Sequence, residues 1–285
     1  SANYTVTTRV CGEVNTFRGE FAPSDQDAGG EGSGREITRF TPSCSFRVRG
    51  RAMYQDRPPT TSGLGQISMR PIRYADVEVR RSSDDEMIGE GATNQNGDFD
   101  IRFSNGADPG YYVIVKSKQD DSQVKQVVHN NSGEIYGVRS VGSINEVVEP
   151  DKAGVEIIAM ENGPGPAFNI FDVGVNAAFY FRSRYGATPS NVNWLWTSGR
   201  RGSCAGDVSC YDNSNSEISV LSIATDRDEY DDFVLLHEWG HKWQVDRSRT
   251  DSGNGEHSPQ NQVDPQLAWG EGLSLIHISE PTRPV

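Results

Sequence analysis

The chain has 285 residues, more than the commonest single-domain size of about 100 to 150 residues, so two domains are expected. It carries 27 Lys and Arg against 40 Asp and Glu, a formal net charge of −13. A negative field of this size repels phosphate backbones, which argues against nucleic acid as a partner. No apolar stretch approaches the roughly 18 to 20 residues of a transmembrane helix, so we expect no membrane-spanning segment.

Residues 1–45 give no clear pattern of helices or strands. Within them, residues 24–36 (SDQDAGGEGSGRE) are rich in Gly and poor in apolar side chains, which is typical of a flexible loop or linker.

From residue 46 onward the chain has the pattern of successive strands. Apolar and polar residues alternate over residues 46–54 and again over 75–80, the period of a strand with one exposed side. The stretch TNQNGDFDIRF then places an Asn96-Gly97 turn before a further alternating run, and GYYVIVKSK supplies another strand. Several short strands separated by turn residues predict an antiparallel β-sandwich domain over residues 46–160.

A five-residue signature runs through that turn and the strand after it: Thr93, Asn94, Gly97, Phe99 and Ile101. It resembles the signature of carboxypeptidase regulatory-like, transthyretin-like modules. Such modules are attached to secreted bacterial enzymes and cell-surface proteins, so the resemblance implies a secreted or cell-surface location, in a bacterium. The alternation itself is equally compatible with a sandwich that binds no ligand.

The pattern changes after the GPGP segment at 163–166. Residues 167–186 (AFNIFDVGVNAAFYFRSRYG) place apolar side chains at helical spacing, whereas NVNWLW and EISVLSIA are apolar runs of strand length. We therefore expect a mixed α/β domain over residues 161–273. The fold class predicted for the whole chain is α+β, a sandwich followed by this mixed domain.

The four cysteines, Cys11, Cys44, Cys204 and Cys210, form an even set. The CAGDVSC spacing closes a small loop that a disulfide between Cys204 and Cys210 could staple, which favours an oxidising compartment. Free buried thiols are the alternative.

The segment DEYDDFVLLHEWGHKWQVDR, residues 228–247, predicts a helix from about 229 to 246 with acidic residues at its positive end. His237 and His241 are four residues apart, so both imidazoles project from one side and can bind a single ion. This is the HExxH arrangement, in which neutral imidazoles suit Zn2+ and the adjacent carboxylate, here Glu238, activates water. Hydrolysis of peptide bonds is the reaction expected from it.

A third protein ligand is expected downstream. A metzincin would have Gly at position 244 and His at 247, but Gln244 and Arg247 stand there, which excludes that subclass. The remaining candidates are His257, Asp264 and Glu271. We favour Glu271, because PQLAWGEGLS has the pattern of a second helix that can carry a carboxylate to a His-His-Glu site.

The pattern resembles that of the gluzincins, in which a W-x-x-E-G-type helix supplies the glutamate. The resemblance implies a zincin-like fold for residues 161–273. More closely, residues 165–273 resemble a family of secreted bacterial zinc metallopeptidases, most specifically at the HEWGH and AWGEG boxes. Carried over by position, the resemblance implies that His237, His241 and Glu271 bind zinc and that Glu238 is the general base. It implies a peptide or protein substrate without specifying which one.

Other polar residues near the HEWGH and AWGEG boxes each have more than one possible role. His257, in the polar loop SGNGEHS, is a candidate oxyanion donor or alternative ligand, or else a solvated loop residue. Asp231, Asp232 and Asp264 could hydrogen-bond the ligand imidazoles, although stabilisation of the helix start explains Asp231 and Asp232 equally well. The loop YDNSNSE could bind calcium, but it matches no EF-hand and an ordinary solvated loop is favoured.

The last residues, LSLIHISEPTRPV, resemble a translated sequencing adapter and not a protein family. We therefore expect residues 274–285 to be adapter-derived and the natural catalytic domain to continue past about Leu273. His277 is then not a ligand, and the catalytic domain of this chain is incomplete.

A non-catalytic protein is the alternative to a zinc metallopeptidase. In that interpretation the sandwich serves cell-surface binding or adhesion, and HEWGH holds a structural metal or none. It predicts no hydrolysis, and a metal content that Glu238→Gln does not change.

Overall fold

A computed structural model describes most of the chain. It covers residues 2–10, 13–21, 44–105, 110–120, 124–146, 148–202, 204, 207–248, 262 and 264–278. The Gly-rich stretch 24–36 and the predicted site residue His257 lie outside the described residues. Strands β1 (Ala2–Val10) and β2 (Glu13–Phe21) pair with each other in an antiparallel hairpin.

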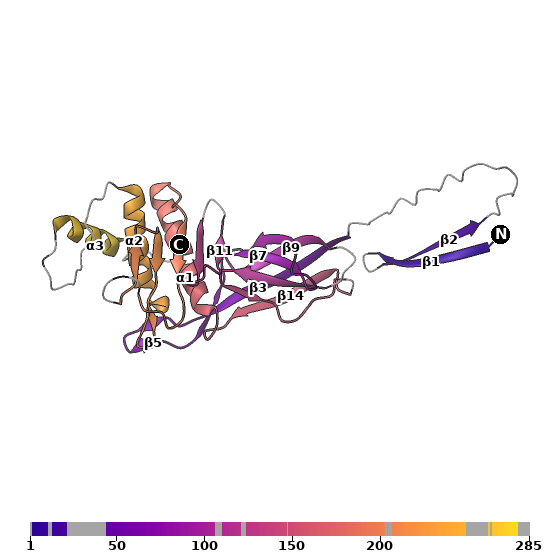
Figure 1. Cartoon of the computed structure of the whole chain (residues 1–285), viewed down its shortest axis with the longest axis horizontal. Coiled ribbons are helices and arrows are strands. Elements are labelled where there is room, and N and C mark those ends of the chain that lie inside the picture. The colour runs from indigo at the N-terminus through magenta and orange to yellow at the C-terminus, as the bar shows by residue number, and fades with distance from the viewer. Residues whose placement is uncertain are drawn as a thin grey trace.

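Two sheets form a sandwich in the middle of the molecule (Figure 1). The first has the order β13 (Gly137–Arg139), β10 (Tyr111–Lys116), β7 (Asp76–Arg81), β8 (Met87–Ala92). The second has the order β14 (Asp151–Ala159), β3 (Cys44–Asp56), β6 (Ser68–Pro71), and β9 (Asp98–Asn105) also pairs with β3. Between β3 and β6 lies a small hairpin of β4 (Pro59–Thr60) and β5 (Gly63–Leu64). Alternate residues of β3, β7, β9 and β10 are buried, as the sequence pattern predicts.

The predicted turn before β9 is confirmed, and three of the signature residues stabilise it. The Asn94 side chain accepts hydrogen bonds from the backbone N–H groups of Asn96 (2.8 Å) and Asp98 (3.0 Å). The Thr93 hydroxyl accepts one from the Ala75 N–H at 2.9 Å. Gly97 has φ +77°, and a Cβ there would lie 2.4 Å from the carbonyl oxygen of Ala52, so only glycine fits.

The sandwich departs from the expected antiparallel pattern at one strand. β14 pairs with β3 in parallel, whereas β6 and β9 pair with β3 antiparallel. A parallel partner requires a crossover connection. The chain makes this crossover when it leaves the first sheet after β13 and returns to the second sheet as β14.

A mixed five-stranded sheet follows, with the order β11 (Lys118–Gln119), β12 (Gln126–His129), β15 (Val192–Leu195), β17 (Glu217–Ser219), β16 (Cys210–Asp212). β12, β15 and β17 run parallel, and β16 pairs antiparallel at the edge. β11 and β12 belong to this sheet although they lie in the range 46–160. The short strands β18 (Ser222–Ile223) and β19 (Asp226–Arg227) form a separate ribbon.

Helix α1 (Gly165–Tyr185) confirms the predicted helix and joins the two layers. Its apolar residues are buried on most sides, because it contacts both β3 of the sandwich and β12 of the mixed sheet. Pro166 stands in its first turn, and Gly186, with φ +62°, ends it. The sandwich, α1 and the mixed sheet consequently share one hydrophobic core.

Two further α-helices complete the described part of the chain: α2 (Asp232–Arg247) and α3 (Pro265–Ile278). The expected start of the first at about 229 is wrong by one turn. Asp228–Tyr230 forms a 3-10 turn, and Asp231 is extended, because its side chain accepts from the N–H groups of Phe233 and Val234 and caps α2. The chain thus has the α+β character that its sequence predicts.

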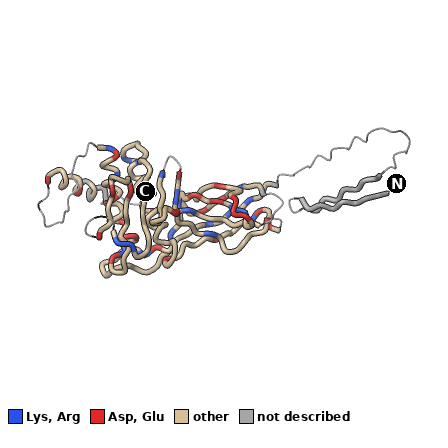
Figure 2. The backbone as a smooth tube through the Cα atoms, in the orientation of Figure 1, with Lys and Arg blue, Asp and Glu red and all other residues tan. Residues whose placement is uncertain are grey.

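Acidic and basic residues are interspersed along the sandwich (Figure 2). Neighbouring strands β3 and β9 place Arg51 2.6 Å from Asp98, and Arg47 pairs with Asp100 in the same way. Of the helices that the structure describes, none has the length and apolar character to cross a bilayer.

Candidate metal centre

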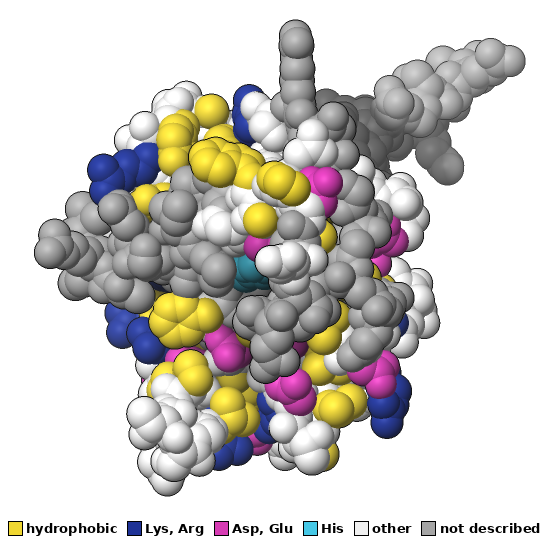
Figure 3. Space-filling view, turned by 90° about the vertical axis from the view of Figure 1, so that its left-hand side faces the viewer, with side chains coloured by type: hydrophobic (Ala, Val, Ile, Leu, Met, Phe, Trp, Pro, Cys, Tyr) yellow, Lys and Arg dark blue, Asp and Glu magenta, His cyan; other side chains and the backbone are white. Residues whose placement is uncertain are grey.

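Helix α2 carries the HEWGH residues and directs its two histidines to one side. The capped N-terminus at Asp231 fixes where the helix begins, and Leu235 and Trp239 anchor its opposite side in the core. His237 and His241 therefore project together, one turn apart. A histidine surface is visible near the middle of this end of the molecule, between apolar and acidic side chains (Figure 3).

Helix α3 brings a carboxylate to the same point. The Glu271 Oε2 atom lies 3.1 Å from Nε2 of His237 and 3.5 Å from Nε2 of His241. The two Nε2 atoms are 3.0 Å apart. All three side chains are about one-fifth exposed, so the cluster is largely shielded but open to one side. The structure thus brings together the three side chains that the sequence predicted as ligands.

This triangle of atoms fits a tetrahedral zinc ion. Zinc binds nitrogen and oxygen ligands at about 2.0 to 2.2 Å, which places two tetrahedral ligands about 3.3 Å apart. The three separations, 3.0, 3.1 and 3.5 Å, bracket that value. Two imidazoles and one carboxylate are also the donor set of catalytic zinc sites that keep a fourth position for water.

A hydrogen bond to Ser274 orients one of the imidazoles. The Ser274 hydroxyl donates to the carbonyl oxygen of Gly270 (3.1 Å) and lies 3.2 Å from Nδ1 of His241. Assigning the hydroxyl proton to the Gly270 carbonyl makes Nδ1–H of His241 the donor to Ser274 Oγ and directs the lone pair of Nε2 into the cluster. Gly240 allows this approach of α3, since a Cβ there would lie 3.1 Å from the Cα of Ser274.

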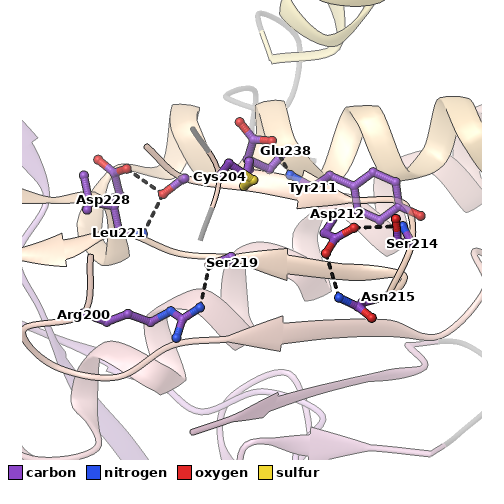
Figure 4. The surroundings of a disulfide bond; sticks show 12 residues. Arg200, Cys204, Tyr211, Asp212, Ser214, Asn215, Ser219, Leu221, Asp228 and Glu238 are labelled. Carbon is purple, nitrogen blue, oxygen red and sulfur yellow. Dashed lines mark hydrogen bonds between the residues drawn. A yellow bond between two sulfur atoms is a disulfide. The ribbon is translucent and has the colours of Figure 1, made fainter. Parts of the chain in front are cut away.

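Glu238 is held on the side of the cluster that faces the edge strand β16. Its carboxylate is buried, and Oε2 accepts a hydrogen bond of 2.8 Å from the backbone N–H of Tyr211 (Figure 4). Ligand atoms of His237, Glu238 and His241 all lie within 4.8 Å of one another. A carboxylate so close to the imidazoles, held by the backbone, can accept a proton from water bound beside it.

Burial and charge act in opposite directions on these groups. Burial raises the pKa of Glu238, and the nearby charges of His241 and His237 and the Tyr211 N–H partly offset that rise. Burial would lower the pKa of His237, but the hydrogen bond to Glu271 and the charges of Glu238 and Glu271 raise it above its ordinary value.

The other predicted site residues lie elsewhere. Asp264 stands at the start of α3, where its carboxylate accepts from the Gln266 N–H at 2.7 Å, as a helix cap does. Both carboxylate oxygens of Asp212, in the YDNSNSE loop, accept from the loop itself, from the Ser214 N–H and the Asn215 side chain. His257 is outside the described residues, and so is the side chain of His277.

Two contacts of the cluster were not predicted. The Tyr211 N–H is a backbone group, which sequence spacing does not reveal. Ser274 lies three residues after Glu271, the spacing of one helical turn, so it shares a side of α3 with the carboxylate. Ser274 was not predicted to contact the site because residues 274–285 are expected to be adapter-derived.

Comparisons with known proteins add little. No protein-family model matches the chain, and no curated protein matches it. Among solved structures it resembles a 9R-lipoxygenase from Cyanothece PCC8801, with 14% identity and a TM-score of 0.23 over 52% of this chain and 25% of that chain. It also resembles the major plantain pollen allergen Pla l 1, with 16% identity and a TM-score of 0.23 over 40% of this chain and 94% of that chain. The chain thus spans about a quarter of the lipoxygenase, and likenesses at these TM-scores carry no argument about function.

Proposed function

We propose that this protein is a zinc-dependent metallopeptidase of the HExxH type, related to the gluzincins. The observation that carries the proposal is the triangle of His237 Nε2, His241 Nε2 and Glu271 Oε2, with separations of 3.0 to 3.5 Å. Three potential ligand atoms at these distances favour a cation among them, and the Glu238 carboxylate stands beside them.

Each residue has a defined task in this proposal. His237, His241 and Glu271 would hold Zn2+, which when bound supplies Lewis acidity. Glu238 accepts the proton of the attacking water and passes it to the leaving amine. The hydrogen bond from Tyr211 keeps the Glu238 carboxylate turned toward the cluster. Ser274 keeps the His241 ring in the tautomer that leaves Nε2 unprotonated.

The position of strand β16 supports a peptide substrate. β16 is the last strand of the five-stranded sheet in the described part of the chain, and it runs beside α2. The Tyr211 N–H is used on Glu238, so an extended chain would pair with the remaining backbone groups of this edge. A peptide laid along β16 would pass next to Glu238, which the Tyr211 N–H places at this edge.

The disulfide between Cys204 and Cys210 supports the proposed secreted or cell-surface location. Disulfides persist in oxidising compartments and are rare in the cytosol. The sequence analysis expected this pairing, with free thiols as the alternative, and the structure contains the bond.

The test is zinc content and peptide hydrolysis measured together on the protein. Glu238→Gln should keep about one zinc per chain and lower kcat by about 100-fold or more, because general-base catalysis contributes about 10²- to 10⁴-fold. Glu217→Gln is the matched control. Glu217 is a half-buried glutamate that also pairs with a histidine, His129 at 3.2 Å, but lies outside the cluster.

Each outcome of this test has a definite meaning. Retained zinc with lost turnover in Glu238→Gln, and ordinary turnover in Glu217→Gln, supports the proposal. Hydrolysis that Glu238→Gln leaves unchanged contradicts the role of Glu238. Zinc binding without any hydrolysis by the native protein favours the alternative, a binding protein with a structural metal.

A further inference from the structure

The strand that holds Glu238 in place is short. β16 has three residues and pairs with β17 through Cys210↔Ser219, Tyr211↔Ile218 and Asp212↔Glu217. It has no strand on its other side in the described part of the chain. A three-residue edge strand is weakly held by its own ladder. Its backbone position nevertheless sets the position of the Tyr211 N–H, and therefore that of the Glu238 carboxylate.

The loop that enters β16 is anchored immediately before Tyr211. Cys210 is covalently bonded to Cys204. Ser209 is buried, and its hydroxyl donates to Asp228 (2.6 Å) and accepts from the Leu221 N–H (2.8 Å). Figure 4 shows the disulfide between the mixed sheet and the Glu238 side chain on α2.

The chain that leads into this loop is also closely packed. A Cβ at Gly202 would lie 2.1 Å from the carbonyl oxygen of Val208, so the chain before Cys204 runs directly against the chain before Cys210. The disulfide closes this doubled-back segment across six residues. Breaking the bond leaves β16 with the Ser209 contacts, the short ladder and the packing of the Tyr211 ring against the core and Lys242.

From this geometry we infer that the Cys204–Cys210 disulfide is a positioning element for Glu238, acting through the Tyr211 N–H. The inference rests on the proposed function, because it assigns Glu238 the role of general base. Reduction by a dithiol transfers two electrons and two protons to the bond, leaving Cys204 and Cys210 as thiols and the reductant as a cyclic disulfide. The reduced protein keeps the zinc ligands on α2 and α3 but loses the fixed position of the general base.

The main experiment compares two double variants of the full chain by kcat per bound zinc. Cys204→Ala/Cys210→Ala should lower kcat by about tenfold with KM and zinc content unchanged, because small misplacements of a catalytic group are costly. Cys11→Ala/Cys44→Ala, the other cysteine pair, should leave kcat per zinc unchanged. Treatment of the native protein with a dithiol should reproduce the loss, and reoxidation should reverse it. The Cys204→Ala/Cys210→Ala variant should not respond to either treatment.

A second readout is independent of turnover. Amide hydrogen exchange should show the Tyr211 N–H protected in the oxidised protein and exposed in both Cys204→Ala/Cys210→Ala and Glu238→Ala. The Val220 N–H, which bonds to the Leu195 carbonyl oxygen at 2.9 Å within the same sheet, should keep its protection throughout.

The inference is overturned if kcat per zinc stays within about twofold of the native value after the disulfide is removed or reduced. It is overturned equally if the Tyr211 amide keeps its protection without the disulfide. Failure of the proposed function gives a different result, since the oxidised native protein would then bind zinc and hydrolyse nothing. In that case the amide exchange still decides whether the disulfide positions Glu238.

Discussion

The sandwich and the helical end of the molecule use their charged residues differently. On β3 and β9, arginines and aspartates lie opposite one another in exposed pairs such as Arg51 with Asp98, where water screens them. On α2 and α3, two imidazoles and two carboxylates converge in a largely buried cluster. The first arrangement is explained by solubility and strand pairing. Burying ionisable groups in the second arrangement costs free energy unless they bind a ligand, so we assign the proposed metal site to this cluster.

The largest effect is expected from the carboxylate that α3 contributes. Glu271→Ala removes one of the three proposed ligands and should weaken zinc binding by at least about 100-fold, since even indirect partners of a metal are worth about 10- to 100-fold. The measurement is a zinc titration with a competing chelator. An unchanged affinity would show that Glu271 is a hydrogen-bond partner of the histidines and not a ligand.

A pH effect is expected from a buried acid at the helical end. Burial raises the pKa of Asp228 to about 6, although the hydrogen bond from Ser209 lowers it. Because the folded pKa exceeds that of an unfolded aspartate, the stability that Asp228 contributes is present below about pH 4 and is lost as the pH rises through about 6. Asn at this position keeps an acceptor for Ser209 but does not titrate.

The free energy of unfolding, measured by urea denaturation, should therefore fall by about 2 kcal/mol more in the native protein than in Asp228→Asn between pH 4 and 7. If the free energy of unfolding changes equally with pH in both proteins, Asp228 does not have a raised pKa in the folded protein. Asp98→Asn, on the exposed surface of the sandwich, is the control.

A smaller effect is expected from the side chain that orients His241. Ser274→Ala removes the acceptor of the Nδ1–H group and should weaken zinc binding by about tenfold. The helix itself should remain, because alanine favours helix. Ser274→Thr keeps the hydroxyl and should restore most of the affinity. Equal loss in both variants would instead indicate that the size of the side chain beside Gly240 matters, and not its hydroxyl.

The smallest effect is expected in the sandwich. Arg51→Ala breaks an exposed ion pair and should change the free energy of unfolding by about 0.5 kcal/mol or less, because surface pairs contribute little. Zinc affinity should not change. A clear loss of zinc binding in this variant would remove the distinction between a scaffold and a site.

Local rules predicted the parts of the site that depend on short spacing. The four-residue interval between His237 and His241, the helix that carries Glu271 and the Asn94 turn all follow from helix geometry or turn chemistry, and the structure contains each of them. The Cys204–Cys210 bond was one of two alternatives, and its short loop favoured it.

Tertiary contacts were less predictable. The parallel direction of β14 depends on how the chain crosses between sheets, and the Tyr211 N–H reaches Glu238 only because β16 packs beside α2. Neither leaves a periodic signal in the sequence. The burial of α1 on two sides does leave a signal in the sequence, since the helix has apolar residues on most of its sides. That signal does not identify its two packing partners, which are distant in the chain.

Zinc K-edge X-ray absorption of the zinc-loaded protein tests the central claim most directly. We expect a four-coordinate shell of nitrogen and oxygen at about 2.0 to 2.2 Å with the multiple-scattering signature of two imidazoles. Glu271→Ala should have one protein scatterer fewer. A shell without imidazole, or one that Glu271→Ala leaves unchanged, would contradict it.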